Sequence, residues 1–196
     1  MSMSALSKIE RLIAQQEIID VIYGYARAID RVDAGVLRSA FWEDGGYREH
    51  YSDEPMHKIA DGLINFLAST FATTQHFIGN ILVNFVDQNT AHVETYFRAF
   101  HLTHPNLGEK RLKEIIGSRR FAELASDADS AYELVVGGRY LDICACRSDE
   151  WRIKERRLLY DFTTIRTASG LTRGEGVSAY VSTWSARDTS DPSYTF

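Results

Sequence analysis

Two residues far apart in the sequence, Asp30 and His76, are of the types needed to transfer protons without a metal. A carboxylate that accepts a hydrogen bond from one imidazole nitrogen fixes the tautomer of the ring and leaves the other nitrogen as a base. A free imidazole has a pKa of about 6.5, so part of it is neutral at physiological pH. If the two side chains meet away from water, they predict a general base that acts on a small, largely apolar molecule.

The apolar periodicity of residues 7–31 predicts the helix that carries Asp30. At about 100° per residue, one line along this helix joins Leu12, Ile19, Tyr23, Ala26 and Asp30, and Ile18, Ile22 and Ile29 widen the stripe. Burying a carboxylate alone is costly, so Asp30 on this apolar side needs a partner. The alternative is an aspartate that borders solvent or caps the turn after the helix.

His76 opens an apolar strand predicted over residues 76–86, and alternation gives this strand a mixed face. That face carries His76, Ile78, Asn80, Leu82 and Asn84. A few polar groups among aliphatic side chains are typical of a pocket wall. On the next strand His101 shares a face with Val93, Thr95, Phe97 and Ala99. We therefore expect Asn80 and His101 to line the same pocket, although a histidine bonded to a backbone carbonyl is the alternative for His76.

The rest of the pattern indicates an α+β domain. Two more helices are predicted over 34–41, where Asp33 is the N-cap, and over 57–73, with the segment EDGGY as a turn into an extended piece that ends near Tyr51. Long strands follow over 91–103, 131–147 and 151–166. Helices followed by antiparallel strands predict a cone-shaped barrel, with the N-terminal helices packed in a long curved antiparallel sheet. We expect a single domain over 1–196, with an inserted loop at 104–130 and a C-terminal tail at 168–196.

Composition narrows the classes of function. The chain has 196 residues, 44% of them hydrophobic, and a net charge of −5, which argues against nucleic acid and anionic membranes as partners. No apolar run is long enough for a membrane span, and the N-terminus turns polar early, so a cytoplasmic protein is expected. The histidines lack metal-binding spacings, and no phosphate loop or GxSxG motif occurs, which predicts no metal and no cofactor.

Four stretches of the chain together resemble a known family. They are YARAIDRVDAGVLRSAFWEDG, TQHFIGN, GGRYLDICACRSDEWRIKERRLLYDF and the terminal DPSY. The sequence resembles the SnoaL-like branch of the nuclear-transport-factor-like cone fold, which includes scytalone dehydratase, bile-acid dehydratase and hexachlorocyclohexane dehydrochlorinase. In the lyases of this group an aspartate on the first helix and a histidine on a strand form the catalytic pair. The resemblance therefore implies catalytic roles for Asp30 and His76.

The resemblance also implies substrate-binding residues. His101 corresponds to a second histidine of scytalone dehydratase, and Tyr25 to a tyrosine of the bile-acid enzyme. Tyr25 lies about 140° around the helix from Asp30, so Tyr23 is the better geometric neighbour. The similarity further implies that Trp42 and Tyr47 are pocket aromatics and that Arg139 matches an arginine on a later strand, which completes the set of expected substrate-binding residues.

The expected function is a cofactor-free lyase, of the dehydratase or dehydrohalogenase type, acting on a small cyclic hydrophobic substrate. An isomerase or cyclase that uses the same base is a close alternative. A non-catalytic small subunit of a ring-hydroxylating dioxygenase and a ligand-binding cone without chemistry are alternatives from other classes. Sheet packing predicts a homodimer or a homotrimer.

Overall fold

The structure of the protein is a computed structural model that describes residues 7–49, 52, 54–124, 129–169, 175–181 and 183–195. The helices are α1 (Lys8–Arg31), α2 (Ala34–Ser39), α3 (Met56–Thr70), α4 (Glu109–Ile116), α5 (Ser118–Glu123) and the short 3₁₀ helices η1 (Gly176–Tyr180) and η2 (Pro192–Tyr194). The strands are β1 (Phe41–Tyr47), β2 (Phe71–Phe85), β3 (Thr90–Thr103), β4 (Tyr132–Arg147) and β5 (Glu150–Thr167). The predicted α+β class is confirmed.

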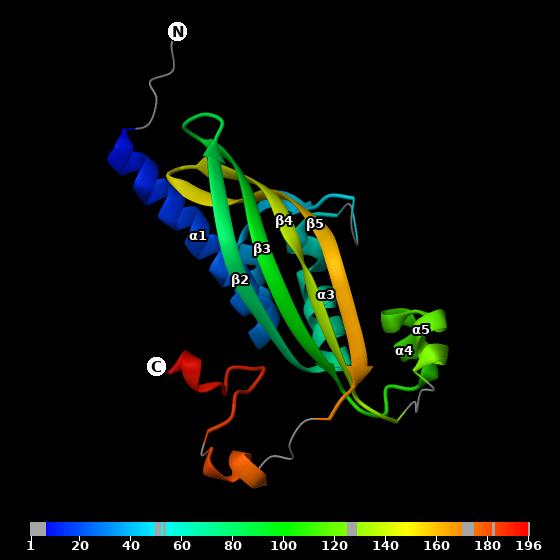
Figure 1. Ribbon diagram of the computed structural model, residues 1–196. Helices are drawn as coiled ribbons and strands as arrows, with labels where there is room; N and C mark the ends of the chain where they lie inside the picture. The colour runs from blue at the N-terminus through cyan, green and yellow to red at the C-terminus, as the bar shows by residue number, and fades with distance from the viewer. Residues whose placement is uncertain are drawn as a thin grey trace.

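The strands form one curved, open sheet in the order β1-β5-β4-β3-β2. Neighbouring strands are antiparallel, except that β1 pairs with β5 in parallel. Helices α1 and α3 lie on one face of this sheet (Figure 1), with α1 against β2 and α3 against β1. The core fills the space between this concave face and the helices, where Ile22, Phe41 and Ile153 are fully or almost fully buried.

Helix α1 begins with a capping box, in which Ser7 and Glu10 each accept a hydrogen bond from the other's backbone N–H. It ends at Val32, which adopts the left-handed conformation at φ 51° and returns its N–H to Ala28. The predicted apolar stripe is only partly correct, because Leu12 and Tyr23 are 66% and 49% exposed. The face that packs into the core is Ala14, Ile18, Ile22, Tyr25, Ala26, Ala28, Ile29 and Asp30.

Two boundaries differ from the predictions for physical reasons. The segment EDGGY is not a turn, because residues 43–47 are part of β1 and pair with the distant strand β5. Helix α3 stops at Thr70 rather than at residue 73, and β2 begins at Phe71 rather than at His76, since Thr73 and Thr74 already pair with β3. Tyr51, the predicted end of the extended piece, lies outside the described residues.

Strand β2 contains a bulge that reverses the alternation of its side chains. Ile78 pairs with Phe97 and Ile81 pairs with Thr95, so three steps on β2 match two steps on β3. An extra residue of this kind moves every later side chain to the opposite face. His76 and Ile78 therefore share the concave side with Ile81, Val83 and Phe85, rather than with Asn80, Leu82 and Asn84 as predicted.

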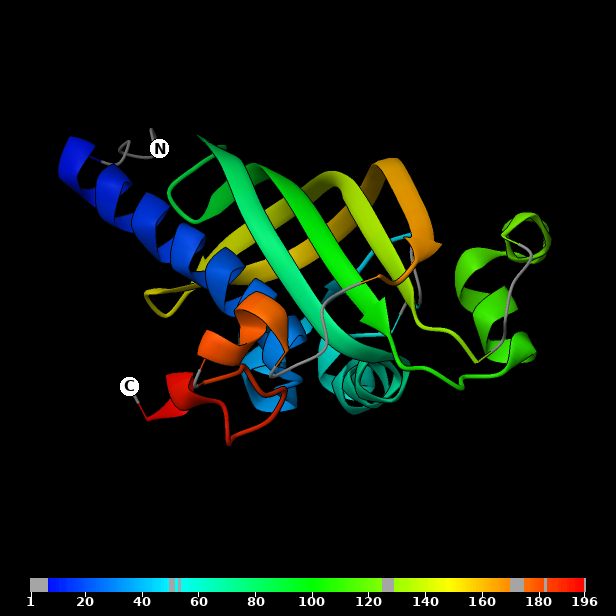
Figure 2. The same ribbon diagram turned by 60° about the horizontal axis from the view of Figure 1, so that its bottom comes forward.

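The predicted insertion at 104–130 holds α4 and α5, which lie at the far end of the molecule from the N-terminus of α1 (Figure 2). Residues 125–128 of this insertion lie outside the described residues. The C-terminal tail, including η1 and η2, lies beside the C-terminal part of α1 (Figure 2). Among the described helices, none is long and apolar enough to cross a membrane.

Candidate active site

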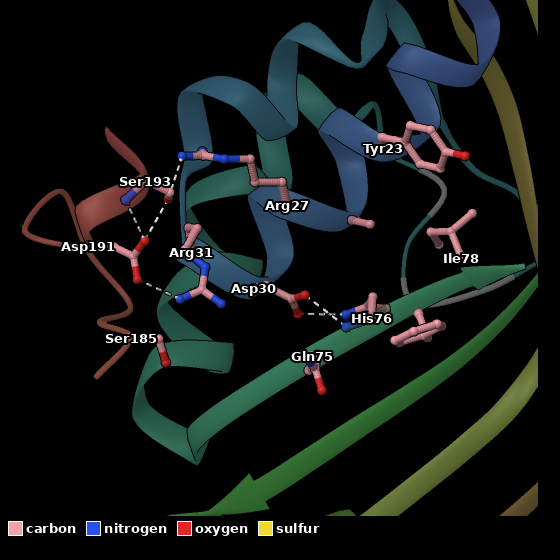
Figure 3. A pocket seen from close by; sticks show the side chains of 12 residues that line it. Tyr23, Arg27, Asp30, Arg31, Gln75, His76, Ile78, Ser185, Asp191 and Ser193 are labelled. Carbon is pink, nitrogen blue, oxygen red and sulfur yellow. Dashed lines mark hydrogen bonds and ion pairs between the residues drawn. The ribbon is translucent and has the colours of Figure 1, made fainter. Parts of the chain in front are cut away.

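Asp30 and His76 meet where the last turn of α1 faces β2. The imidazole Nδ1 lies 2.7 Å from Asp30 Oδ1, and the backbone N–H of His76 donates to Asp30 Oδ2 at 2.8 Å (Figure 3). Only 7% of the His76 side chain and 11% of the Asp30 side chain are exposed. Two hydrogen bonds from one residue hold both carboxylate oxygens, so the carboxylate is fixed relative to the imidazole ring.

The environment keeps Asp30 ionised. Burial alone raises the pKa of this carboxyl, but the hydrogen bonds and charge of His76, together with a hydrogen bond from Thr74, bring the pKa below its ordinary value. An ionised carboxylate can only accept a hydrogen bond, so the proton between the two groups belongs to Nδ1. His76 in its neutral form therefore carries its free lone pair on Nε2, the nitrogen that faces away from Asp30 in the imidazole ring.

His101 lies next to His76. The two rings meet edge to face, with their centroids 5.7 Å apart, and the centroid of the Phe71 ring lies 4.9 Å from that of His101. Burial, and after it the nearby His76, lowers the pKa of His101 to about 4. His101 is therefore neutral at neutral pH. Its Nδ1 is buried and has no hydrogen-bond partner among the described residues.

A pocket of about 550 Å³ opens beside the Asp30–His76 pair. It is lined by twelve residues of α1, β2 and the tail (Figure 3), namely Tyr23, Ala26, Arg27, Asp30, Arg31, Gln75, His76, Phe77, Ile78, Ser185, Asp191 and Ser193. Tyr23 and Ile78 lie at one end and the arginines and tail residues at the other (Figure 3). The pocket thus joins an apolar end to a polar end, with the imidazole between them.

Of the three tyrosines expected at the site, one lines the pocket and two lie in the core. Tyr23 lines the pocket, in agreement with the helical geometry. Tyr25 points instead into the core, where it is 4% exposed and its hydroxyl lies 2.5 Å from that of Tyr47. Tyr25 and Tyr47 are therefore core residues, and neither lines the pocket.

Three further residues expected to bind substrate lie away from the pocket. Trp42 donates its indole N–H to the Ala145 carbonyl at 2.9 Å, at the β1 edge of the sheet. Asn80 is exposed, because the bulge in β2 turns it outward. Arg139 lies on the outer face of the sheet, where it forms ion pairs with Glu94 at 3.4 Å and Asp161 at 3.3 Å. His101 is close to the pair but is also not among the lining residues.

The tail supplies pocket residues that the sequence did not indicate. Arg31 forms an ion pair with Asp191 at 3.0 Å, and Arg27 donates to the Ser193 hydroxyl at 3.1 Å. The guanidinium of Arg27 also lies 4.4 Å from the centre of the Tyr194 ring. A signal was present, since two arginines one helical turn apart could pair with the acidic tail RDTSDPSY, but no spacing rule joins segments so distant in sequence.

No group of three or more histidine, cysteine, aspartate or glutamate side chains in the described part of the chain is arranged to hold a metal ion. The chemistry that the arrangement itself can perform is proton transfer. It combines an imidazole oriented by an ionised carboxylate with an open pocket beside the pair.

The profile of the SnoaL-like domain matches residues 10–157, so the chain belongs to the SnoaL-like family. This confirms the resemblance to the nuclear-transport-factor-like cone fold. Among curated proteins, no sequence matches the chain significantly.

Solved structures show the same fold at low identity. A candidate scytalone dehydratase from Novosphingobium aromaticivorans is 19% identical with a TM-score of 0.62, over 86% of this chain and 100% of that one. The hexachlorocyclohexane dehydrochlorinase LinA-type3 from Novosphingobium barchaimii is 15% identical with a TM-score of 0.62, over 84% and 97%. A candidate aromatic ring hydroxylase from N. aromaticivorans is 17% identical with a TM-score of 0.58, over 83% and 96%.

Proposed function

We propose that this protein is a lyase, of the dehydratase or dehydrohalogenase type, in which His76 oriented by Asp30 removes a proton from a small cyclic hydrophobic substrate. The observation that carries the proposal is the 2.7 Å contact between the two side chains at the wall of a pocket. A scaffold has little use for a buried carboxylate and imidazole, since burying such groups is costly. Similarity to a candidate scytalone dehydratase and to a dehydrochlorinase supports the same class.

The proposed step is an elimination that needs no cofactor. Nε2 of His76 takes a proton from a substrate carbon, the electrons of that C–H bond form a carbon–carbon double bond, and hydroxide or halide leaves from the adjacent carbon. Asp30 stabilises the imidazolium as it forms. In a dehydration the departing hydroxyl takes a proton back from the His76 imidazolium and leaves as water, which restores the neutral imidazole. We assign Tyr23, whose side chain lines the pocket, as a hydrogen-bond donor to the leaving group.

The apolar end of the pocket fits a hydrophobic ring. Tyr23, Ala26 and Ile78 offer apolar surface next to His76. Water excluded by such a ring no longer screens the charges of the pair, which strengthens the interaction between the imidazolium and Asp30 in the transition state. An isomerase would use the same base but return the proton to another carbon, so the product distinguishes the two reactions.

The test is a set of cyclic hydroxyketones and chlorinated alicyclic compounds incubated with the protein in D₂O and analysed by mass spectrometry. We expect elimination products from at least one class, and His76→Ala to abolish most of the turnover while the fold is kept. His92→Ala is the matched control, because His92 is an exposed histidine on β3. Wild-type turnover in His76→Ala would contradict the proposal. Solvent deuterium in an isomer without elimination would favour the isomerase.

A non-catalytic subunit makes a different prediction. Such a protein would purify only together with a larger, iron-containing chain and would catalyse no exchange of substrate hydrogens. We expect instead a homodimer or homotrimer by light scattering when the chain is expressed alone. Exposed apolar side chains on the sheet, including Phe77, Tyr160 and Phe162, are consistent with such an assembly.

A further inference from the structure

The tail that lies along α1 places an arginine, Arg187, at the C-terminal ends of both α1 and α3. We propose that Arg187 is a positioning residue, which holds the Asp30 backbone and the Thr74 hydroxyl so that Asp30 and His76 keep their mutual geometry. The proposal rests on the proposed function only for its effect on turnover. Its structural part concerns the Asp30–His76 pair alone.

The first set of contacts holds the end of α1. Arg187 Nε donates to the carbonyl of Asp30 at 3.2 Å, and Nη2 donates to the carbonyl of Ile29 at 3.3 Å. The last four carbonyls of a helix have no partner within that helix, and a cation at this end is favourable to the helix dipole. Arg187 therefore fixes the backbone of the residue that carries the carboxylate, without touching the carboxylate itself.

The second set of contacts holds the start of β2. Nη2 also donates to Thr74 Oγ1 at 3.2 Å, and Nη1 donates to the carbonyls of Phe71 and, at 3.3 Å, of Leu67. Thr74 is 1% exposed and lies two residues before His76 on the same face of the strand. The five hydrogen bonds thus tie the two helix ends to the strand that carries the imidazole.

The Thr74 hydroxyl connects Arg187 to the carboxylate. Its oxygen accepts from Arg187, so its own proton is free to point at Asp30, and the hydrogen bond from Thr74 is one of the causes that lower the pKa of Asp30. The positive charge of Arg187 also contributes to the lowered pKa of His101. Arg187 therefore acts on the Asp30 carboxylate through the Thr74 hydroxyl, and on the neighbouring His101 through its charge.

A planar guanidinium suits this position better than an ammonium. Arginine presents five N–H donors in a rigid fork, and here they reach acceptors on two helices and one strand. Lysine would keep the positive charge but could not span the same acceptors at once. Replacement by lysine and by methionine therefore separates the effect of the charge from the effect of the geometry.

The experiment compares Arg187→Met and Arg187→Lys with Tyr194→Phe. Tyr194 is the matched control for the tail, because its hydroxyl donates to Asp33 at 3.0 Å and it does not line the pocket. NMR follows two properties that need no substrate: the Asp30 carboxyl pKa, by carbon shifts, and the His76 tautomer, by nitrogen shifts. Turnover is measured separately wherever a substrate has been found.

In Arg187→Met we expect a raised Asp30 pKa, a mixture of His76 tautomers, and kcat reduced about 10–100-fold with little change in KM. In Arg187→Lys, which keeps the cation at the helix ends, we expect the Asp30 pKa to stay nearer that of the wild type while kcat remains low. Tyr194→Phe should leave the pKa and the tautomer unchanged.

The proposal would be overturned if Arg187→Met left both NMR properties as in the wild type, or if Tyr194→Phe changed them equally, since Arg187 would then only fasten the tail. Altered NMR properties in Arg187→Met, in a protein inactive on every compound tried, would support the positioning role while counting against the proposed lyase.

Discussion

Two of the buried carboxylates in this protein, Asp30 and Asp142, form pairs with basic side chains that differ in what they can do. Asp30 and His76 lie between α1 and β2 at the wall of the pocket, and each keeps a small exposed part. Asp142 and Arg156 lie on neighbouring strands, β4 and β5, and both side chains are 0% exposed. The first pair faces a volume that a molecule can enter, whereas the second is enclosed by protein.

The enclosed pair is held from several directions. Arg156 Nε and Nη2 each donate to one oxygen of Asp142 at 2.7 Å, and the guanidinium contacts the rings of both Tyr25 and Tyr140, 4.0 Å from each centroid. Burial lowers the pKa of Arg156, but the charge of Asp142 and the hydrogen bonds to it outweigh that effect and raise the pKa. Arg156 therefore keeps its positive charge although its side chain is fully buried.

The comparison shows that the basic partner decides the chemistry. An imidazole can exchange its proton near neutral pH. Asp30 contacts only Nδ1 of the His76 ring, so Nε2 is not bonded to Asp30. A guanidinium does not lose its proton in proteins, so the bond between Asp142 and Arg156 is structural. Asp142 therefore joins two strands, whereas Asp30 has the type of partner that the proposed proton transfer requires.

The largest effect is expected for Asp30→Asn. Oδ1 of the new side chain would accept the His76 backbone N–H, and the amide NH₂ would then face Nδ1 and force the proton to Nε2. His76 would lose the free lone pair on Nε2, so kcat should fall by about 10³-fold. Steady-state kinetics on the substrate found for the wild type measures the fall, and near-ultraviolet circular dichroism checks that the fold is kept. Activity within tenfold of the wild type would contradict the assignment of the base.

The enclosed pair should respond in stability rather than in chemistry. Arg156→Met leaves the Asp142 carboxylate buried without a partner, which costs about 3–5 kcal/mol, or roughly 10 °C in Tm for a chain of this size. Replacing both residues, as Asp142→Leu with Arg156→Met, should be less destabilising than the single variant, because no charge is then left alone. Arg139→Met on the outer face is the matched control. Equal melting curves for Arg156→Met and Arg139→Met would contradict this view.

A smaller effect concerns His101 and pH. Its folded pKa of about 4 lies below the ordinary 6.5, so the unfolded chain binds the proton more readily. Stability from this group is complete above about pH 6.5 and is lost as the pH falls toward 4, by up to about 3 kcal/mol. The pKa of Asp30 is also lowered, and the stability that Asp30 contributes is lost only at a pH below about 4.

Urea unfolding at pH 7, 5.5 and 4.5 measures the loss. In His101→Leu the decrease in the free energy of unfolding between these values should be clearly smaller than in the wild type. The exposed His92→Leu is the control for removing a histidine from the same strand. A decrease as steep in His101→Leu as in the wild type would show that other groups cause it.

The sequence predicted those parts of the fold and the site for which local patterns and strong chemical constraints agree. The change from helical to alternating periodicity predicted the α+β order, and a carboxylate on an apolar helix face required a partner such as His76. Contacts between distant segments escaped prediction. The pairing of β1 with β5 turned EDGGY into a strand, and neither the tail contacts nor the bond between Asp142 and Arg156 follows from spacing.

The bulge in β2 could not be predicted from the sequence either. The variant that tests it has the smallest expected effect. Strict alternation places Asn80 beside His76, but the extra residue between Ile78 and Ile81 turns Asn80 to the outside. Asn80→Ala should therefore leave kcat/KM within about twofold of the wild type. Ile78→Ala, which removes apolar surface from the pocket, should raise KM several-fold, since each buried CH₂ is worth about 0.8 kcal/mol.

Measured side by side, these two variants decide on which face of β2 the substrate lies. A strong effect of Asn80→Ala together with a weak effect of Ile78→Ala would mean that the substrate approaches from the convex face. The Asp30–His76 pair would then lie on the wrong side of the strand to act on it. Because both variants are small truncations on the same strand, a difference between them reports the position of the side chain rather than damage to the sheet.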